Sequence, residues 1–179
     1  KSKTGDTTHG YFILCTFIPD MIAYNVEAVY AKVVHACKIA EKHGVGIVTL
    51  GGVTSVVGER YGHEIRDEVD IPITTGNTYT VALAVDGVER AVQLFGRELK
   101  DLKITIVGGT GDIGSACARG LSEKAKQVTV TGRTKSNLRA LRDYLKKKRS
   151  ARIEATTDNQ RAVKDADIVI AAATSLSPI

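Results

Sequence analysis

The sequence KITIVGGTGDIGSACARGL, residues 103–121, decides the fold of the second half of this chain. It begins with KITIVG (103–108), an apolar and β-branched run typical of a buried strand. The glycines come next, and residues 112–125 then have the periodicity of a helix. A buried strand, a glycine turn and a helix in this order predict the opening unit of a parallel sheet.

The same alternation continues to the last residues of the chain. Strands are expected at QVTVTG (127–132), ARIEAT (151–156) and DIVIAAAT (167–174), and helices at KSNLRALRDYLKKKR (135–149) and NQRAVKDA (159–166). Strands separated by helices need crossover connections, which produce a parallel sheet with helices on both faces. The expected fold class is α/β, with an N-terminal mixed α/β lobe followed by a Rossmann-type doubly wound parallel sheet that stops after its fourth strand.

The glycines have the spacing Gly109-x-Gly111-x-x-Gly114 of a dinucleotide-binding fingerprint, in the strand and helix context that the fingerprint requires. Gly109 is expected to allow the tight turn, Gly111 to let a diphosphate approach the backbone, and Gly114 to let the helix pack closely. The N–H groups and partial positive charge at the helix start would hold the phosphates. The predicted cofactor-binding residues of the loop are Gly109, Thr110, Gly111, Asp112, Ile113 and Gly114. The alternative is a glycine-rich turn without a ligand.

The residues after the second strand of the sheet indicate which dinucleotide is bound. An NAD site places Asp or Glu there, against the ribose hydroxyls, but this chain has Gly132-Arg133-Thr134-Lys135. Arg133 can form charge-assisted hydrogen bonds to a 2′-phosphate, and Thr134 and Lys135 can add donors. We therefore predict NADP, used as NADPH, as the cofactor; the alternative is that Arg133 is a surface arginine. Thr174, at the end of the fourth strand, is expected on the nicotinamide side.

The first half of the chain predicts a separate lobe. VEAVYAKVVHACKIAEKHG (26–44) has one apolar stripe at helical spacing and a glycine placed to end the helix. VGIVTLGG (45–52) is strand-like, and TTGNTYTVALAVDGVERAVQLFG (74–96) is expected to be a loop that opens a long linking helix. The expected domains are 1–98, a substrate and catalytic lobe with the linking helix, and 99–179, an incomplete nucleotide-binding domain.

Charge is distributed unevenly along the 179 residues, whose formal net charge is +5. Residues 1–99 contain 9 Lys and Arg against 12 Asp and Glu, a net charge of −3. Residues 100–179 contain 16 against 8, a net charge of +8. The basic half suits an anionic cofactor or an acidic protein partner, and no nucleic-acid partner is expected because aromatic residues are not interleaved with the cations.

Neither a membrane span nor a disulfide framework is expected. The apolar run YFILCTFI (11–18) is far shorter than the roughly 18 residues that a membrane helix needs. Cys15, Cys37 and Cys117 are odd in number, widely spaced and without a CxxC pair, so no metal site is expected either. We expect a cytoplasmic protein whose cysteines are core residues.

Four blocks of the sequence together resemble a known family, the long-chain acyl-[acyl-carrier-protein] reductases of cyanobacteria and their bacterial relatives. They are FIPDMI (17–22), EKHGVGIVTLGGVTSVVGE (41–59), TTGNTYTVA (74–82) and VGGTGDIGSA (107–116). The resemblance runs from about His9 to the end of the chain. More distantly, GNTYTVA (76–82) and GRTKSNL (132–138) are similar to the shikimate dehydrogenase and methylene-tetrahydromethanopterin dehydrogenase arrangement.

The resemblance implies NADPH-dependent reduction of a fatty acyl thioester, carried on acyl-carrier protein, to an aldehyde. In the family the nucleophilic cysteine lies beyond the fourth strand of the nucleotide fold, where this chain has no residues. The chain starts with Lys1 and stops directly after that strand, so we expect the natural protein to continue for roughly 100 residues, enough to complete the sheet. The oligomeric state, including a homo-oligomer, stays open.

Matches to the family blocks also select candidate substrate residues in the first half. Asn77 is the candidate catalytic residue, because its amide can donate to a substrate carbonyl and polarise it. The candidate substrate-binding residues are Gly51, Gly52, Thr54, Ser55, Thr75, Gly76 and Thr78. Each of these residues also has a purely structural alternative. Thr75, Asn77 or Thr78 could cap the following helix, and Gly51-Gly52 could form a tight turn after the strand. No metal ligand is predicted.

Two other functions stay open on the sequence alone. One is an NADP-dependent dehydrogenase of a small polar substrate, for which the uncharged TTGNTYT (74–80) and GGVTS (51–55) blocks give little support. The other is a non-catalytic NADP-binding module that senses redox state or presents an interaction surface.

Overall fold

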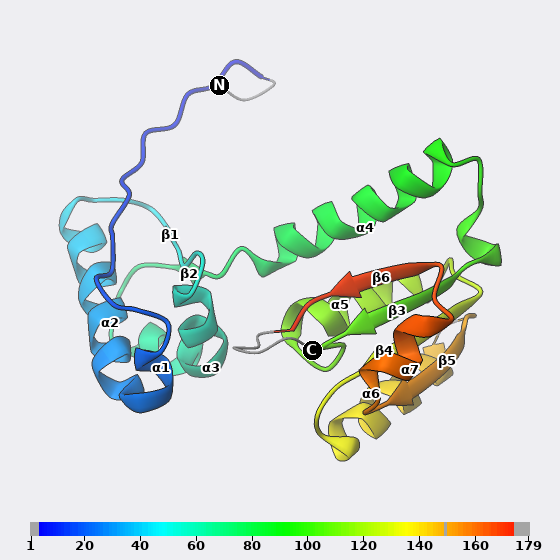
Figure 1. Cartoon of the computed structure of the whole chain (residues 1–179). Helices are drawn as coiled ribbons and strands as arrows, with labels where there is room; N and C mark the ends of the chain where they lie inside the picture. Colours follow the sequence, from blue (N-terminus) through cyan, green and yellow to red (C-terminus); the bar gives the residue numbers. More distant parts are fainter. Residues whose placement is uncertain (1–3, 149, 174–179) are drawn as a thin grey trace. The chain divides into compact units, whose positions relative to one another are not determined.

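The computed structural model describes residues 4–148 and 150–173, and the chain divides into two compact units on either side of the Gly76–Asn77 bond (Figure 1). The first unit combines helices with two very short strands, and the second begins with a long helix followed by alternating strands and helices. Among the described residues, no helix has the length and apolar character required to cross a bilayer.

The second unit is built on a four-stranded parallel sheet with the strand order β5-β4-β3-β6. Its elements are β3 (Lys103–Val107), α5 (Asp112–Leu121), β4 (Gln127–Thr131), α6 (Lys135–Lys148), β5 (Arg152–Thr156), α7 (Asn159–Lys164) and β6 (Ile168–Ala171). The chain moves outward from β3 to β5 and then crosses to β6 on the other side of β3. This order is that of the first four strands of a Rossmann fold and confirms the predicted fold class.

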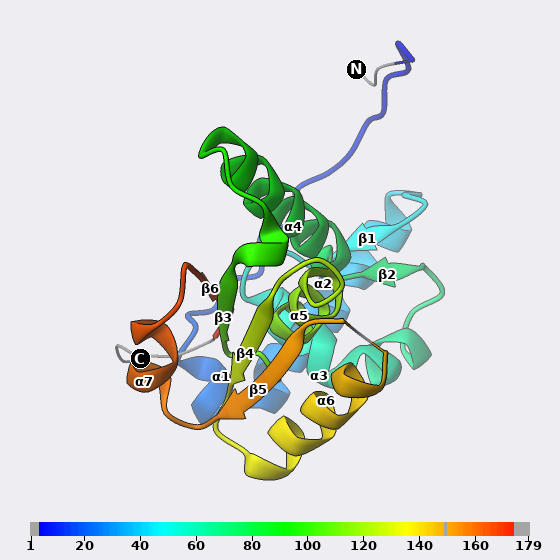
Figure 2. The same ribbon diagram turned by 90° about the vertical axis from the view of Figure 1, so that its right-hand side faces the viewer.

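The sheet is buried between helices, as its continuous apolar strands predict. α5 and α6 cover one face, and α7 covers the other (Figure 2). Cys117 and Leu121 of α5 pack with Leu138 and Leu145 of α6 in the core on the first face. On the second face, Oγ1 of Thr105 in β3 donates to a main-chain carbonyl of α7, at 2.7 Å.

The long helix α4 (Asn77–Leu94) runs along α5 and is part of the second unit. Its apolar stripe, from Val81 to Val88, packs against the core that contains α5, and Glu89 pairs with Lys124 at 2.7 Å. A 3-10 helix, η1 (Leu99–Asp101), then leads into β3. The structural division therefore differs from the boundary at residue 98 that the sequence leads us to expect, because this helix buries its apolar face in the nucleotide-binding unit.

The first unit contains α1 (Met21–Tyr24), α2 (Val26–Lys42), β1 (Val48–Thr49), α3 (Thr54–Asp67) and β2 (Ile73–Thr74). β1 and β2 pair in parallel, so their carboxyl ends lie at the same edge. Gly44, with φ of 67°, follows the end of α2, as predicted. The core of this unit includes Val33 and Cys37 of α2 with Val57 and Ile65 of α3.

Residues 6–18 and α3 differ from the sequence expectations. The apolar run around Cys15 favours a strand, but residues 6–18 form none, and residues 13–16 lie beside α2, where Lys32 Nζ donates to the carbonyl of Thr16 at 2.6 Å. No helix is expected from the sequence at residues 54–67, where the structure has α3. Gly58 permits close packing, since a Cβ there would lie 2.8 Å from Cδ1 of Leu50.

Candidate functional site

The glycine loop between β3 and α5 is held in place by close backbone contacts. Gly108 has φ of 77°, and a Cβ there would lie 2.7 Å from the carbonyl oxygen of Ala172, just after β6. A Cβ on Gly109 would lie 2.8 Å from Cβ of Val130, and one on Gly114 only 2.3 Å from the oxygen of Gly108. Each of these three glycines is therefore required by the packing of the loop itself.

Gly108 is the loop residue that the sequence reasoning missed. The prediction assigns the tight turn to Gly109, but the positive φ occurs one residue earlier. The signal was the pair of adjacent glycines after a buried strand, since either can take the left-handed conformation. Which of the two glycines must lack a side chain depends on the residues just after β6, and these are too distant in the sequence for a local pattern to include them.

Gly111 differs from the other glycines because the protein does not need it for packing. It caps α5 with extended backbone angles that any residue adopts (φ −75°, ψ 171°), and the atom nearest to an added Cβ is the Gly108 oxygen at 3.4 Å. Gly111 is exposed, and the first N–H groups of α5 beyond it lack intrahelical acceptors. The missing side chain thus leaves room above a helix N-terminus, and a diphosphate fits that cradle.

Cations lie at the end of β4, beside the loop. A Cβ on Gly132 would lie 2.8 Å from Oγ1 of Thr110, so the loop reaches this strand end. Arg133, Thr134 and Lys135 are exposed, and their side chains make no hydrogen bond or ion pair within residues 4–148 and 150–173. A donor set of this kind suits a 2′-phosphate.

Asp112 and Ile113 begin α5 and have different surroundings. Ile113 is partly buried against the core, and Asp112 is exposed. Nδ2 of Asn77, the first residue of α4, donates to Oδ2 of Asp112 at 3.0 Å. The Asn77 side chain thus has a carboxylate partner in the loop. Thr174 lies outside the described residues.

The candidate substrate residues of the first unit gather where β1 and β2 end. Oγ1 of Thr54 donates to the carbonyl of Gly51 (2.8 Å), and Oγ of Ser55 donates to that of Gly52 (2.7 Å), at the start of α3. These bonds are local contacts of the kind expected if Gly51-Gly52 is a tight turn, which is the alternative to substrate binding. Thr75 is brought near this turn, because its Cγ2 would lie 3.0 Å from a Cβ on Gly58 of α3.

Gly76 and Thr78 flank the division between the units. Gly76 has φ of 72°, and a Cβ on it would lie 3.6 Å from Cγ2 of Thr49. Thr78 is exposed on the first turn of α4. The positive φ makes a glycine favourable at the turn from β2 into α4.

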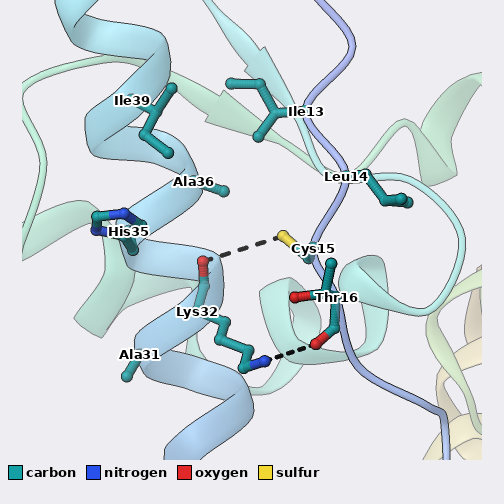
Figure 3. A pocket seen from close by; sticks show the side chains of 9 residues that line it. All are labelled: Ile13, Leu14, Cys15, Thr16, Ala31, Lys32, His35, Ala36 and Ile39. Atoms are coloured by element: carbon teal, nitrogen blue, oxygen red, sulfur yellow. Dashed lines mark hydrogen bonds between the residues drawn. The ribbon is translucent and has the colours of Figure 1, made fainter.

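A cavity of about 270 Å³ lies between residues 13–16 and the 31–39 part of α2 (Figure 3). The Cys15 thiol points at the main-chain oxygen of Lys32, 4.0 Å away. Burial raises the pKa of Cys15, more than the Lys32 ammonium lowers it. The pKa values of Cys37 and Cys117 are also raised by burial. All three thiols therefore have less thiolate than an exposed cysteine, which argues against a nucleophile among them.

Comparison with protein families supports the nucleotide-binding assignment. The family model described as NADP oxidoreductase coenzyme F420-dependent matches residues 103–175, the range from β3 through β6. This match confirms the prediction of NADP as the cofactor of the second unit.

Curated proteins are also similar to this chain, among them a reductase and an aminotransferase. The long-chain acyl-[acyl-carrier-protein] reductase of Synechococcus elongatus is 33% identical over 94% of this chain and 50% of the reductase. Aminotransferase PigE of a Serratia species is 26% identical over 66% of this chain and 14% of the aminotransferase. The chain thus spans half the length of the first relative and a small part of the second. The match to the reductase confirms the resemblance that the sequence blocks indicate and supports an NADP oxidoreductase.

A solved structure is also similar. Shikimate 5-dehydrogenase from Listeria monocytogenes, in complex with shikimate and NAD, matches 60% of this chain and 37% of that chain, with 18% identity and a TM-score of 0.41.

Proposed function

We propose, on the premise of this similarity to an acyl-carrier-protein reductase, that the chain is the cofactor-binding part and a portion of the substrate region of an NADPH-dependent enzyme. The enzyme would reduce a fatty acyl thioester on acyl-carrier protein to an aldehyde. The observation that carries the cofactor assignment is the space that Gly111 leaves above the start of α5. The 33% identity over 94% of the chain supports the substrate class.

The residues of the second unit have separate roles in this proposal. Gly108, Gly109 and Gly114 hold the loop against β4 and β6, and Gly111 leaves the N–H groups of α5 open to a diphosphate. Arg133, with Thr134 and Lys135, binds the 2′-phosphate and selects NADP over NAD. Bound NADPH supplies the hydride for reduction.

The overall reaction balances without another reactant. A thioester, NADPH and a proton give an aldehyde, a free thiol and NADP⁺. The resemblance implies a cysteine nucleophile, whose thiolate would displace the carrier thiol before reduction. The resemblance implies that this cysteine lies beyond the fourth strand of the nucleotide-binding unit, and the raised pKa values of Cys15, Cys37 and Cys117 agree with a core role for these three residues.

The proposal also covers the first unit, the protein partner and the cellular compartment. The edge where β1 and β2 end, with Gly51, Gly52, Thr54, Ser55 and Thr75, is our candidate for an acyl-group contact. The +8 charge of residues 100–179 suits the acidic surface of a carrier protein, and binding to it would weaken as salt is added. The free cysteines suit the reducing cytoplasm that we propose as its compartment.

The test is a reaction of the natural polypeptide that contains this chain. It would be incubated with acyl-carrier-protein thioester and NADPH while NADPH oxidation and aldehyde formation are measured. Both signals support the proposal. NADPH binding without turnover of any thioester would favour a sensor module, and turnover of a small polar substrate instead would favour the dehydrogenase alternative.

A further inference from the structure

The hydrogen bond between Asn77 and Asp112 joins the first residues of two parallel helices. Asn77 is only 8% exposed, and its Nδ2 donates to Oδ2 of Asp112 at 3.0 Å. Farther along, Gly120 of α5 lies beside Val85 of α4, where an added Cβ would be 3.5 Å from Cγ2 of the valine. The two helices therefore stay side by side beyond their first turns, and Asn77 has a fixed position relative to the start of α5.

Asp112 is an unusual neighbour for a phosphate. A carboxylate in the first turn of a helix is favoured by the helix dipole and can accept from the N–H groups there. A diphosphate would use the same N–H groups and the same partial charge. An unrestrained Asp112 would thus compete with the diphosphate for donors and repel it by charge.

We propose that Asn77 is a positioning residue for the nucleotide site: it holds the Asp112 carboxylate toward α4 and leaves the N-terminus of α5 open to the diphosphate of NADPH. This inference rests on the NADPH-binding part of the proposed function. The expected contact between Asn77 and a substrate carbonyl stays a separate prediction, because the second N–H of the amide is not used by the bond to Asp112.

The proposal is tested by NADPH titration of the chain and its variants, with thermal unfolding as the measure of folding. Asn77→Ala is expected to weaken NADPH binding about tenfold, the scale of one lost hydrogen bond to a charged group. Adding Asp112→Asn to Asn77→Ala is expected to bring the affinity back to within about threefold of the original, because the unrestrained side chain is then neutral. Gln93→Ala, which removes an exposed amide from the same helix, is the matched control and should bind NADPH normally.

An isosteric pair of variants covers the case in which Asn77→Ala does not fold. Asn77→Asp places a second carboxylate against Asp112 and should weaken NADPH binding. The exchange Asn77→Asp with Asp112→Asn rebuilds the hydrogen bond in the opposite direction and should restore binding. Loss that persists in both double variants would overturn the proposal, because Asn77 would then act on helix packing rather than through the carboxylate. Unchanged affinity in Asn77→Ala would also overturn it. If the unaltered chain does not bind NADPH, the proposed cofactor site fails, and this inference fails with it.

Discussion

Gly111 and Gly114 lie three residues apart in the same loop, yet alanine at the two positions should have opposite consequences. At Gly114, an added Cβ would lie 2.3 Å from the Gly108 oxygen and 2.9 Å from Cα of Gly109. Both are backbone atoms, so neither can rotate away. At Gly111, the closest atom is 3.4 Å away, and the backbone angles suit alanine. We therefore expect Gly114→Ala to lose stability and Gly111→Ala to lose cofactor binding.

The magnitudes follow from opposing terms. Overpacking by one methyl group costs about 1–3 kcal/mol, and the backbone contact at Gly114 places this change near the upper end. Replacing glycine by alanine inside a helix stabilises it by about 1 kcal/mol, so Gly114→Ala should reduce the free energy of unfolding by about 2 kcal/mol. At Gly111, the loss of a favourable cap, about 0.5–1 kcal/mol, is offset by a similar gain from restricting the unfolded chain. A methyl group in the diphosphate path should weaken NADPH binding by about 10- to 100-fold.

The assay combines urea unfolding without ligand and titration with NADPH. Because the chain has no tryptophan, binding is followed through the fluorescence of NADPH itself. Gly87→Ala is the matched control, since Gly87 is in α4 and a Cβ there would have no neighbour within 4 Å. It should be slightly more stable and bind normally. Equal destabilisation by the two loop substitutions, or normal NADPH binding by Gly111→Ala, would refute the distinction between a packing glycine and a ligand glycine.

Three further substitutions test separate parts of the second unit. Arg133→Ala should remove most of an expected 10- to 100-fold preference for NADP over NAD, measured by parallel titrations, with NAD affinity nearly unchanged; equal losses for both would make Arg133 structural. The pKa of Asp167 is lowered chiefly by the hydrogen bond from the Lys103 N–H and then by Arg97. The ionised Asp167 carboxylate therefore stabilises the fold at neutral pH, and this stabilisation is lost as pH falls below the usual carboxyl range. Asp167→Asn should therefore cost about 1 kcal/mol at pH 7, and urea unfolding should show the gap to the original chain closing in acid. Thr131→Val should leave the free energy of unfolding unchanged or raise it by up to about 1 kcal/mol, because the buried Thr131 hydroxyl has no partner among the described residues; a clear loss would show that the hydroxyl is satisfied.

The parallel sheet was predictable because its signals are local. Each strand from β3 to β6 is a short run that contains buried or partly buried apolar residues, and β3, β4 and β5 are each followed by a helix that makes the crossover to the next strand. The four expected strands agree with the structure to within three residues at either end. Gly44 could likewise be placed at the end of α2, because a glycine after a helical stripe is a local feature.

The first unit was harder to predict because its elements depend on distant contacts. β1 and β2 contain two residues each, too few for any periodicity, and they exist because Val48 pairs with Ile73. α3 contains Gly58, which weakens a helix in isolation but here allows contact with Leu50. The apolar run 11–18 has a strand's composition but no neighbouring strand, so it stays unpaired beside α2.

In the candidate site too, features with a local sequence signal were predictable, and features that depend on distant contacts were not. Phosphate recognition uses backbone N–H groups, so its requirement is a set of glycines at fixed spacing, and the sequence displays it directly. Even there, the need for glycine at position 108 depends on Ala172, just after the neighbouring strand β6, which leaves no room for a side chain. Asn77 illustrates the other case: an amide at a helix start is compatible with a cap, a substrate donor or a contact elsewhere, and its 3.0 Å bond to Asp112 is visible only in the structure. A contact with a partner 35 residues away has no local signature, and this is why the glycine loop could be predicted from the sequence while the contact between Asn77 and Asp112 could not.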